Sequence, residues 1–387
     1  MQRPLMMTLS VIIASSLVGL ITGFTIPLIS LDMANKGMTP FFIGFLAALP
    51  AAGMLVASFI APWLSSKIGL TKILSGALAI LIIATLASCL LQNLYLLSPF
   101  RLMTGIASGV LVVLGESWIA GGASLRYRAA LTGLYTSTFT GFQLAGPLLI
   151  NIEKYSLVYF LLFITVFSLI SVLFANKSNV KLTPENRDQI SWKSLVSFLP
   201  VLSSGVFCFS FFDATVLSIF PLYSMTQGLT EALSVLLISV ILIGDAAFQV
   251  PIGYVADKFG VRRVHLFLGI MFCVSVLCLP YLFTSTLLLI AGCVVLGAVA
   301  GGLYTLSLVR AGTLLSGQRL IVINAMLNLI WAAGSISGPV ISGTVISHVG
   351  YQGFTGVIFM TGILFLFFQL LPFDVKKSQC SENVSQR

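Results

Sequence analysis

The sequence is poor in charge. Only 8% of its 387 residues are Asp, Glu, Lys or Arg, whereas 58% are hydrophobic. A soluble domain carries about 25% charged residues on average, so this composition excludes an ordinary soluble protein. In lipid, a chain must pair its backbone polar groups internally, as a helix or a closed barrel. Because the apolar runs are long and lack the short alternating segments of a barrel, we expect membrane-spanning helices.

Motifs for metal, nucleotide and covalent chemistry are also absent from the sequence. It contains no CxxC pair, no glycine-rich phosphate loop ending in Lys and no Gly-x-Ser-x-Gly. The two histidines, His265 and His348, are far apart, and five of the six cysteines lie in apolar runs, where they pack as small hydrophobic residues. We therefore expect no disulfide framework, metal, cofactor, ATP-driven pump or catalytic domain.

The net charge of +9 does not indicate a nucleic-acid partner. Binding of nucleic acid needs a clustered basic face, but here Lys and Arg lie in the short connections between apolar runs. If both termini are cytoplasmic, seventeen of the twenty lie on that side, and only Lys36, Arg101 and Lys154 lie at or near the outer side. This positive-inside bias predicts cytoplasmic termini in a plasma membrane, as in a bacterial inner membrane.

Runs of about twenty apolar residues, the length that crosses a bilayer, predict twelve spans. They cover residues 8–30, 40–63, 72–91, 98–120, 129–150, 156–175, 195–224, 232–254, 264–284, 286–309, 320–345 and 353–371. The first run continues past Ile29 with no Ala-x-Ala site after it, so we interpret it as a span and not as a secretory signal. Between the sixth and seventh spans, Asn176–Lys193 is polar and interrupted by Pro184, which predicts a water-exposed linker.

Residues of the two halves repeat at offsets of 191 to 194 positions. The matching pairs are Pro27 with Pro221, Gly69 with Gly260, Gly105 with Gly297, Gly109 with Gly301, and Gly146-Pro147 with Gly338-Pro339. The repeat predicts an all-α membrane protein of two pseudo-symmetric six-helix bundles, 1–175 and 195–387, joined by a linker at 176–194. Parallel repeats of this kind place a solute site at their interface, near the bilayer midplane.

Loop motifs extend this interpretation to a family. The connection between the eighth and ninth spans carries Gly253, Asp257, Lys258, Gly260, Arg262 and Arg263. This pattern resembles the loop signature of the major facilitator superfamily. The copy between the second and third spans keeps Lys67 and Gly69 but has Ser66 where the family prefers Asp. The resemblance implies that Asp257 lies at the cytoplasmic face, near the positive N-terminal end of the fifth span.

Two further motifs point the same way. Arg101, Gly105 and Gly109 resemble the Arg-x-x-x-Gly signature of the fourth helix, and with the following Glu116-Ser117 the stretch is similar to YcaD-like members of the superfamily. Gly146-Pro147 resembles part of the antiporter motif that the family carries in its fifth helix. Gly338-Pro339 repeats this pair in the eleventh span. The partial match favours export, although small residues also serve close helix packing alone.

The resemblance implies a secondary transporter that works by alternating access. Acidic residues within spans are functional candidates because charge is costly in the membrane. Asp213 is the preferred proton-coupling residue, because the seventh helix of the family lines the central cavity. Asp245 and Glu116 are the alternatives. A carboxylate satisfied only by neighbouring polar groups remains the competing interpretation for each.

Polar residues within other spans are candidates for solute binding. Arg101 binds an anionic group, steers a proton or only extends toward the membrane surface. Glu116 is expected to close the cytoplasmic gate with Arg126 or Arg128. The uncharged candidates are Thr22, Thr25, Gln143, Tyr304, Asn324, Asn328 and Trp331. We therefore expect a monomer that couples protons to efflux of small amphipathic compounds. The alternative is proton-coupled uptake of a small solute or organic anion; a channel and an enzyme fit less well.

Overall fold

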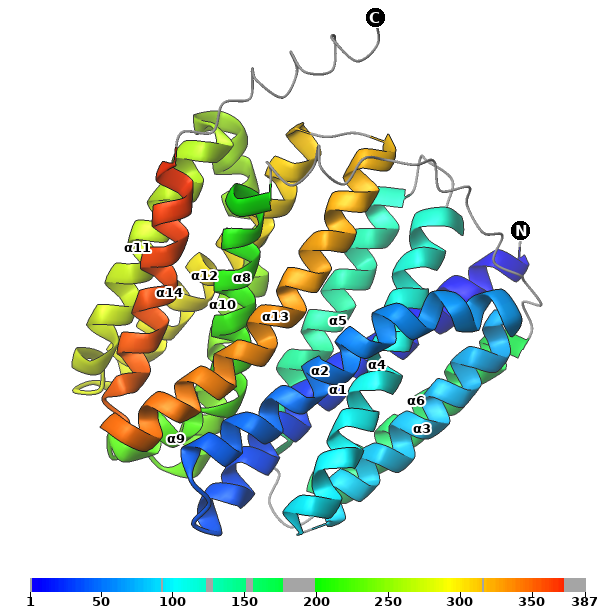
Figure 1. Ribbon diagram of the computed structural model, residues 1–387, viewed down its shortest axis with the longest axis horizontal. Coiled ribbons are helices and arrows are strands. Elements are labelled where there is room, and N and C mark those ends of the chain that lie inside the picture. The colour runs from blue at the N-terminus through cyan, green and yellow to red at the C-terminus, as the bar shows by residue number, and fades with distance from the viewer. Residues whose placement is uncertain are drawn as a thin grey trace, which may run out of the picture.

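The computed structural model describes residues 2–91, 93–122, 128–150, 156–176, 199–314 and 317–371. Within these ranges the chain forms thirteen helices (Figure 1). The first half contains α1 (Gln2–Asn35), α2 (Pro40–Lys67), α3 (Leu70–Leu90), α4 (Leu94–Gly122), α5 (Arg128–Ile150) and α6 (Ser156–Asn176). The second half contains α8 (Leu199–Ser218), α9 (Phe220–Thr226), α10 (Glu231–Phe259), α11 (Val261–Leu282), α12 (Thr286–Leu314), α13 (Gly317–Val349) and α14 (Gly353–Leu370).

The helices coincide with the predicted spans. Ten of the described helices are long and apolar enough to cross a membrane, and the apolar part of α6 is shorter. Because α8 and α9 together cover the predicted span at 195–224, the thirteen helices account for all twelve spans. The prediction of an all-helical membrane protein is therefore confirmed. Nearly all of the predicted linker at 176–194 lies outside the described residues.

The seventh predicted span differs from expectation because it is broken. α8 ends at Ser218 and α9 begins at Phe220. Pro221, in the first turn of α9, has no N–H, and its ring clashes with a continuing helix. The corresponding Pro27 lies inside α1 without ending it. The same residue at the same place in the repeat thus has different consequences in the two halves.

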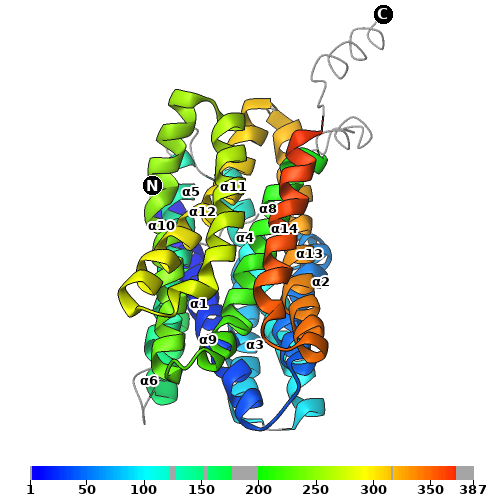
Figure 2. The same cartoon turned by 90° about the vertical axis from the view of Figure 1, so that its left-hand side faces the viewer.

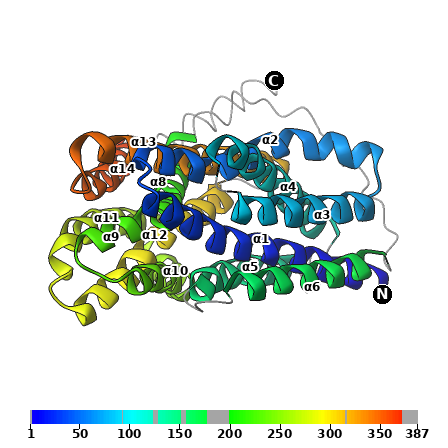
Figure 3. The same cartoon turned by 90° about the horizontal axis from the view of Figure 1, so that it is seen from below.

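Each half is held together by the same set of helix contacts. In the first half α1 lies against α5 and α6, α4 against α2 and α3, and α3 against α6. In the second half α8 lies against α13 and α14, α12 against α10 and α11, and α11 against α14. Figure 2 shows the second half from the side, with α11 beside α14. The halves gather on opposite sides of the molecule (Figure 3) and meet where α2 contacts α13 and α5 contacts α10.

Glycines permit the closest of these helix crossings. A Cβ at Gly105 of α4 would overlap the Pro50 carbonyl of α2, and one at Gly297 of α12 would overlap the Ile241 carbonyl of α10. The Gly146 and Gly338 positions behave alike, because they face the backbones of α1 and α8 respectively. Small residues let helix backbones approach closely in lipid, where packing replaces the hydrophobic effect as the source of association.

Replacement of Gly297 by Ala tests this packing. Because the new methyl group would meet the Ile241 carbonyl oxygen, we expect Gly297→Ala to lower the free energy of unfolding by about 1–3 kcal/mol. Gly76→Ala is the matched control, since nothing lies within 4 Å of its added Cβ, and it should be neutral or slightly stabilising. Thermal unfolding in detergent measures both. Equal midpoints for the two variants would contradict the assigned crossing.

Candidate functional site

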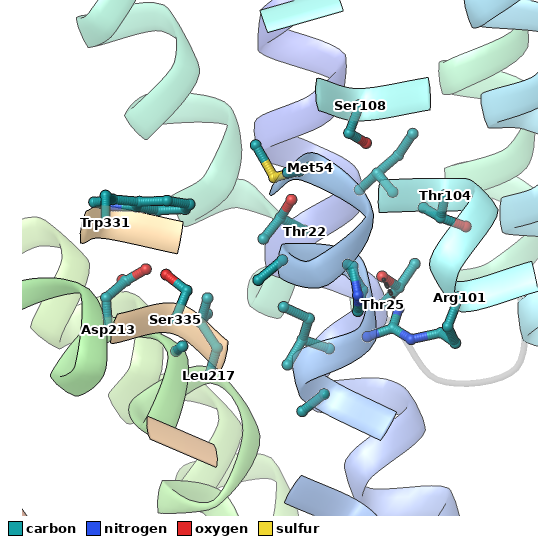
Figure 4. A pocket seen from close by; sticks show the side chains of 16 residues that line it. Thr22, Thr25, Met54, Arg101, Thr104, Ser108, Asp213, Leu217, Trp331 and Ser335 are labelled. Carbon is teal, nitrogen blue, oxygen red and sulfur yellow. Dashed lines mark hydrogen bonds between the residues drawn. The ribbon is translucent and has the colours of Figure 1, made fainter. Parts of the chain in front are cut away.

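A small cavity lies between the halves (Figure 4). Helices α1, α2 and α4 form one wall, and α8 and α13 form the other. Its lining residues are Ile21, Thr22, Thr25, Ile26, Ala47, Pro50, Ala51, Met54, Arg101, Thr104, Ser108, Asp213, Ala214, Leu217, Trp331 and Ser335. The free space is about 40 Å³, enough for water molecules. A larger solute requires the walls to separate.

Arg101 is fully buried in the wall formed by the first half. Its Nη1 donates to Thr25 Oγ1 at 3.0 Å and its Nε donates to the Leu46 carbonyl at 3.4 Å. The side chain is 1% exposed, so it does not extend toward the membrane surface. Among the described residues no acidic group forms an ion pair with it. Since a guanidinium has five N–H donors and a permanent charge, Arg101 brings an uncompensated cation to the cavity.

Asp213 faces the same cavity from the opposite wall. It lies on α8, close to Trp331 and Ser335 of α13 in the close-up (Figure 4). The Gln143 amide of α5 interacts with its carboxyl group, and the preceding Phe211 and Phe212 are each 2% exposed. The carboxyl group thus combines an apolar setting with access to the cavity.

Asp245 occupies a different environment from Asp213. Its Oδ1 accepts a hydrogen bond from Gln249 at 3.0 Å, within α10. A Cβ at Gly301 of α12 would overlap the same oxygen. Asp245 is 6% exposed and is not among the residues that line the cavity. The carboxylate therefore lies in the α10–α12 crossing, and the glycine at 301 makes room for it.

Glu116 and Asn328 make a contact between the halves. Asn328 of α13 donates from Nδ2 to Glu116 Oε2 of α4 at 3.3 Å, and both side chains are exposed. Tyr304 of α12 is not among the residues that line the cavity, and its ring lies against Phe209. The side chains of Asn324, Arg126 and Arg128 lie outside the described residues, so the expected gate of Glu116 with either arginine stays a prediction.

The two ends of the molecule differ in how the halves join. We call the end where α1 begins and α14 ends the terminal end, and the other the opposite end. One hydrophobic core extends along the second half and includes first-half residues only toward the opposite end, among them Ile29 and Ile43. The two other cores of described residues each lie within one half, one within α1–α6 and a smaller one around Leu202 and Leu327.

Polar contacts between the halves follow the same division. At the opposite end the Phe41 N–H donates to Ser347 Oγ at 3.0 Å, and Ser239 Oγ donates to the Leu144 carbonyl at 3.1 Å. Toward the terminal end, Glu116–Asn328 is the one hydrogen bond that joins the halves among the described residues. Among the described residues, the halves are therefore joined by more contacts at the opposite end than at the terminal end.

The loop motif lies at the terminal end, between α10 and α11. Gly260 has φ 93°, a conformation that favours glycine, whereas the repeat-related Gly69 has φ −64°. Asp257 is exposed and forms no hydrogen bond or ion pair with the other described residues. The side chains in the first turn of α5, its expected neighbours, lie outside the described residues. We still predict that Asp257 stabilises the conformation in which the terminal end is closed.

Sequence reasoning found five lining residues and missed others. Thr22, Thr25, Arg101, Asp213 and Trp331 were candidates, and all line the cavity. The missed polar residues are Thr104, Ser108 and Ser335. The first two were accessible from the sequence, because they follow Arg101 at helical spacing on one face of α4. Ser335 carries no comparable local signal.

The hydrogen bond between Thr25 and Arg101 can be tested by comparing two threonines of α1. Thr25→Val removes a partner of a buried guanidinium, so we expect a loss of about 1.5–3 kcal/mol of unfolding free energy. Thr22→Val is the matched control, because Thr22 also lines the cavity but bonds only the Val18 carbonyl of its own helix. Chemical unfolding in detergent distinguishes them. A loss at Thr22 as large as that at Thr25 would refute the role of this bond.

Comparisons with known proteins place the chain in a family. The family model of the Major Facilitator Superfamily matches residues 11–244 and 202–382. The uncharacterized MFS-type transporter YfkF of Bacillus subtilis (strain 168) is 25% identical over 350 residues, 85% of each chain. The uncharacterized MFS-type transporter YcaD of Escherichia coli O45:K1 is 24% identical over 349 residues, 87% of each chain.

A solved structure shows the same fold. A bacterial homologue of the human lysosomal transporter Spinster, in an inward-facing and occupied conformation, superposes with a TM-score of 0.76 over 98% of this chain and 97% of that chain. The sequence identity is 13%, so this likeness concerns the fold alone. Together with the helix repeat and the cavity between the halves, the family match shows that the chain belongs to the Major Facilitator Superfamily and is a secondary transporter.

Proposed function

We propose that this transporter couples protons to the export of a small amphipathic solute through the cavity between Arg101 and Asp213. The observation that carries the proposal is the position of Asp213: an acidic side chain in an apolar setting faces a cavity between two halves that are closed at one end. Such a group can take up a proton when the cavity opens to one side and release it when the cavity opens to the other.

The unequal joining of the halves at the two ends supports transport by alternating access. The core that joins the halves only toward the opposite end, and the two cores that stay within one half each, support a conformation that opens toward the terminal end. We propose that residues 1–175 and 195–387 move as two bodies linked by 176–194. Rocking of these bodies would separate Phe41 from Ser347 while bringing Asp257 toward α5. The motion keeps the glycine crossings within each half intact and changes the crossing of α2 with α13, where Gly44 faces the Pro339 carbonyl and Gly343 faces the Pro40 carbonyl.

The positive-inside distribution of Lys and Arg supports a cytoplasmic terminal end, so the described conformation would face inward. A bacterial plasma membrane is consistent with the bacterial relatives. In this orientation an inwardly directed proton gradient would protonate Asp213 from outside. A solute with a cationic group would then compete with that proton at the inner side, and this competition produces exchange and therefore export.

Uptake of an organic anion is the second candidate, and Arg101 is the observation that favours it. A buried guanidinium without an acidic partner among the described residues is suited to a carboxylate or phosphate. Under this alternative the proton and the solute would move in the same direction. Measuring the direction of proton movement against a solute gradient separates the two candidates.

The Asp213→Asn variant tests proton coupling. Asn keeps the shape but cannot titrate, so in proteoliposomes we expect loss of transport driven by a pH gradient, while solute exchange without a gradient continues. Solutes for the assay are those that raise the unfolding midpoint of the purified protein. Asp32→Asn is the control, because that carboxylate pairs with Lys36 on the surface, away from the cavity. Retention of gradient-driven transport by Asp213→Asn would transfer the role to Asp245 or Glu116.

A further inference from the structure

We propose that the cavity recognises a dipolar solute, one that carries an anionic and a cationic group in the same molecule. The anionic group would bind at Arg101, and the cationic group would bind at Asp213 beside Trp331. This inference rests on the proposed use of the cavity as the solute site and names its substrate class. The observation behind it is that two opposite charges face one cavity from different halves without pairing with each other (Figure 4).

The Arg101 wall is suited to an anion. Burial of an unpaired cation is costly, and the cost falls when a hydrogen-bonded anion compensates it. The two hydrogen bonds that Arg101 donates to other described residues use only Nε and one N–H of Nη1, so donors remain for a carboxylate in the fork geometry that guanidinium favours. Thr104 and Ser108 line the cavity on the same helix. Both bonds go to α1 and α2 and fix the guanidinium in place.

The Asp213 wall is suited to a cation. An ammonium group would meet the carboxylate, and the indole of Trp331 adds an aromatic face of the kind that attracts cations. Ser335 lies on the same wall and is 3% exposed. Its Oγ has no hydrogen-bond partner among the described residues. A buried hydroxyl left without a partner costs free energy, and a polar solute group in the cavity would supply one.

Because the two charges lie on different halves, the cavity is selective for a dipolar solute over a singly charged one. A solute with both groups would compensate Arg101 and Asp213 together and bridge the walls as they close. A simple cation would leave Arg101 uncompensated and would be repelled by it, and a simple anion would meet the same difficulty at Asp213. Specificity of this kind comes from the penalty on the wrong ligand as much as from the fit of the right one.

The experiment compares three charge forms of the same scaffold. Phenylalanine and tryptophan serve as dipolar probes; phenethylamine and tryptamine, which lack the carboxylate, are the cationic forms, and N-acetylphenylalanine and N-acetyltryptophan are the anionic forms. Binding to the purified full-length protein is measured by thermal shift and calorimetry at neutral pH. We expect at least one scaffold to bind about tenfold more tightly in its dipolar form than in either singly charged form, the scale expected for one charged hydrogen bond.

Variants assign each charge to its wall. Arg101→Gln should remove the advantage of the dipolar form over the cationic amine, whereas Arg101→Lys should retain part of it because the charge remains. Asp213→Asn should remove the advantage over the N-acetyl form. Lys36→Gln and Asp32→Asn are controls, since this pair lies outside the cavity. If Arg101→Gln does not fold, the order of the three forms with the unsubstituted protein and with Arg101→Lys decides.

Three results would overturn the inference: tighter binding of a singly charged form, no binding of any form, or an equal loss for all forms in Arg101→Gln, which would indicate a purely structural arginine. Proton release on binding, followed with a pH dye, separates this inference from the proposed function. Dipolar selectivity without proton release would leave the inference standing and count against proton coupling. Proton release caused only by singly charged solutes would support proton coupling and count against dipolar recognition.

Discussion

The cost of placing charge in hydrocarbon constrains this structure more than any other interaction. A charged side chain at the bilayer centre costs at least about 2.5–3.5 kcal/mol, so Arg101, Asp213 and Asp245 all turn inward. They do so in different ways. Arg101 uses the Thr25 hydroxyl and a carbonyl, Asp245 uses Gln249 within its own helix, and Asp213 reaches the cavity. Of the three, Arg101 and Asp213 line the cavity, where a solute or a proton can reach them.

Close helix packing supplies the frame that holds these charges. Glycines at repeat-related positions bring α4 onto α2 and α12 onto α10. The frame is not fully symmetric, however. Asp245 lies against Gly301 in the second half, whereas the related crossing in the first half has Gly109 against Ala57 and Met54. The break at Ile219 and the positive φ of Gly260 are further differences between the halves.

Much of the fold could be predicted because span length and repeated glycines are local properties of the sequence. The five lining residues were found because polar side chains are rare in apolar helices, so each one stands out. Other features depend on how a helix is rotated about its axis and which neighbour it meets. Asp245 and Asp213 are both isolated acids in apolar runs of the sequence. The structure distinguishes them, because Asp245 packs against Gly301 of α12 whereas Asp213 lines the cavity. The hydrogen bond between Glu116 and Asn328 joins residues 212 positions apart, a pairing that no local pattern encodes.

The central claim is that the halves alternate between closure at the opposite end and closure at the terminal end. Spin labels measure both ends directly in a protein without its native cysteines. Trp63→Cys with Phe259→Cys reports the terminal end, and Met38→Cys with Leu287→Cys reports the opposite end, since all four side chains are exposed. When a stabilising solute or a change of pH shifts the populations, the account predicts that the distances in one pair shorten as those in the other lengthen. Distances that stay fixed at both ends, or change in the same direction, would contradict it.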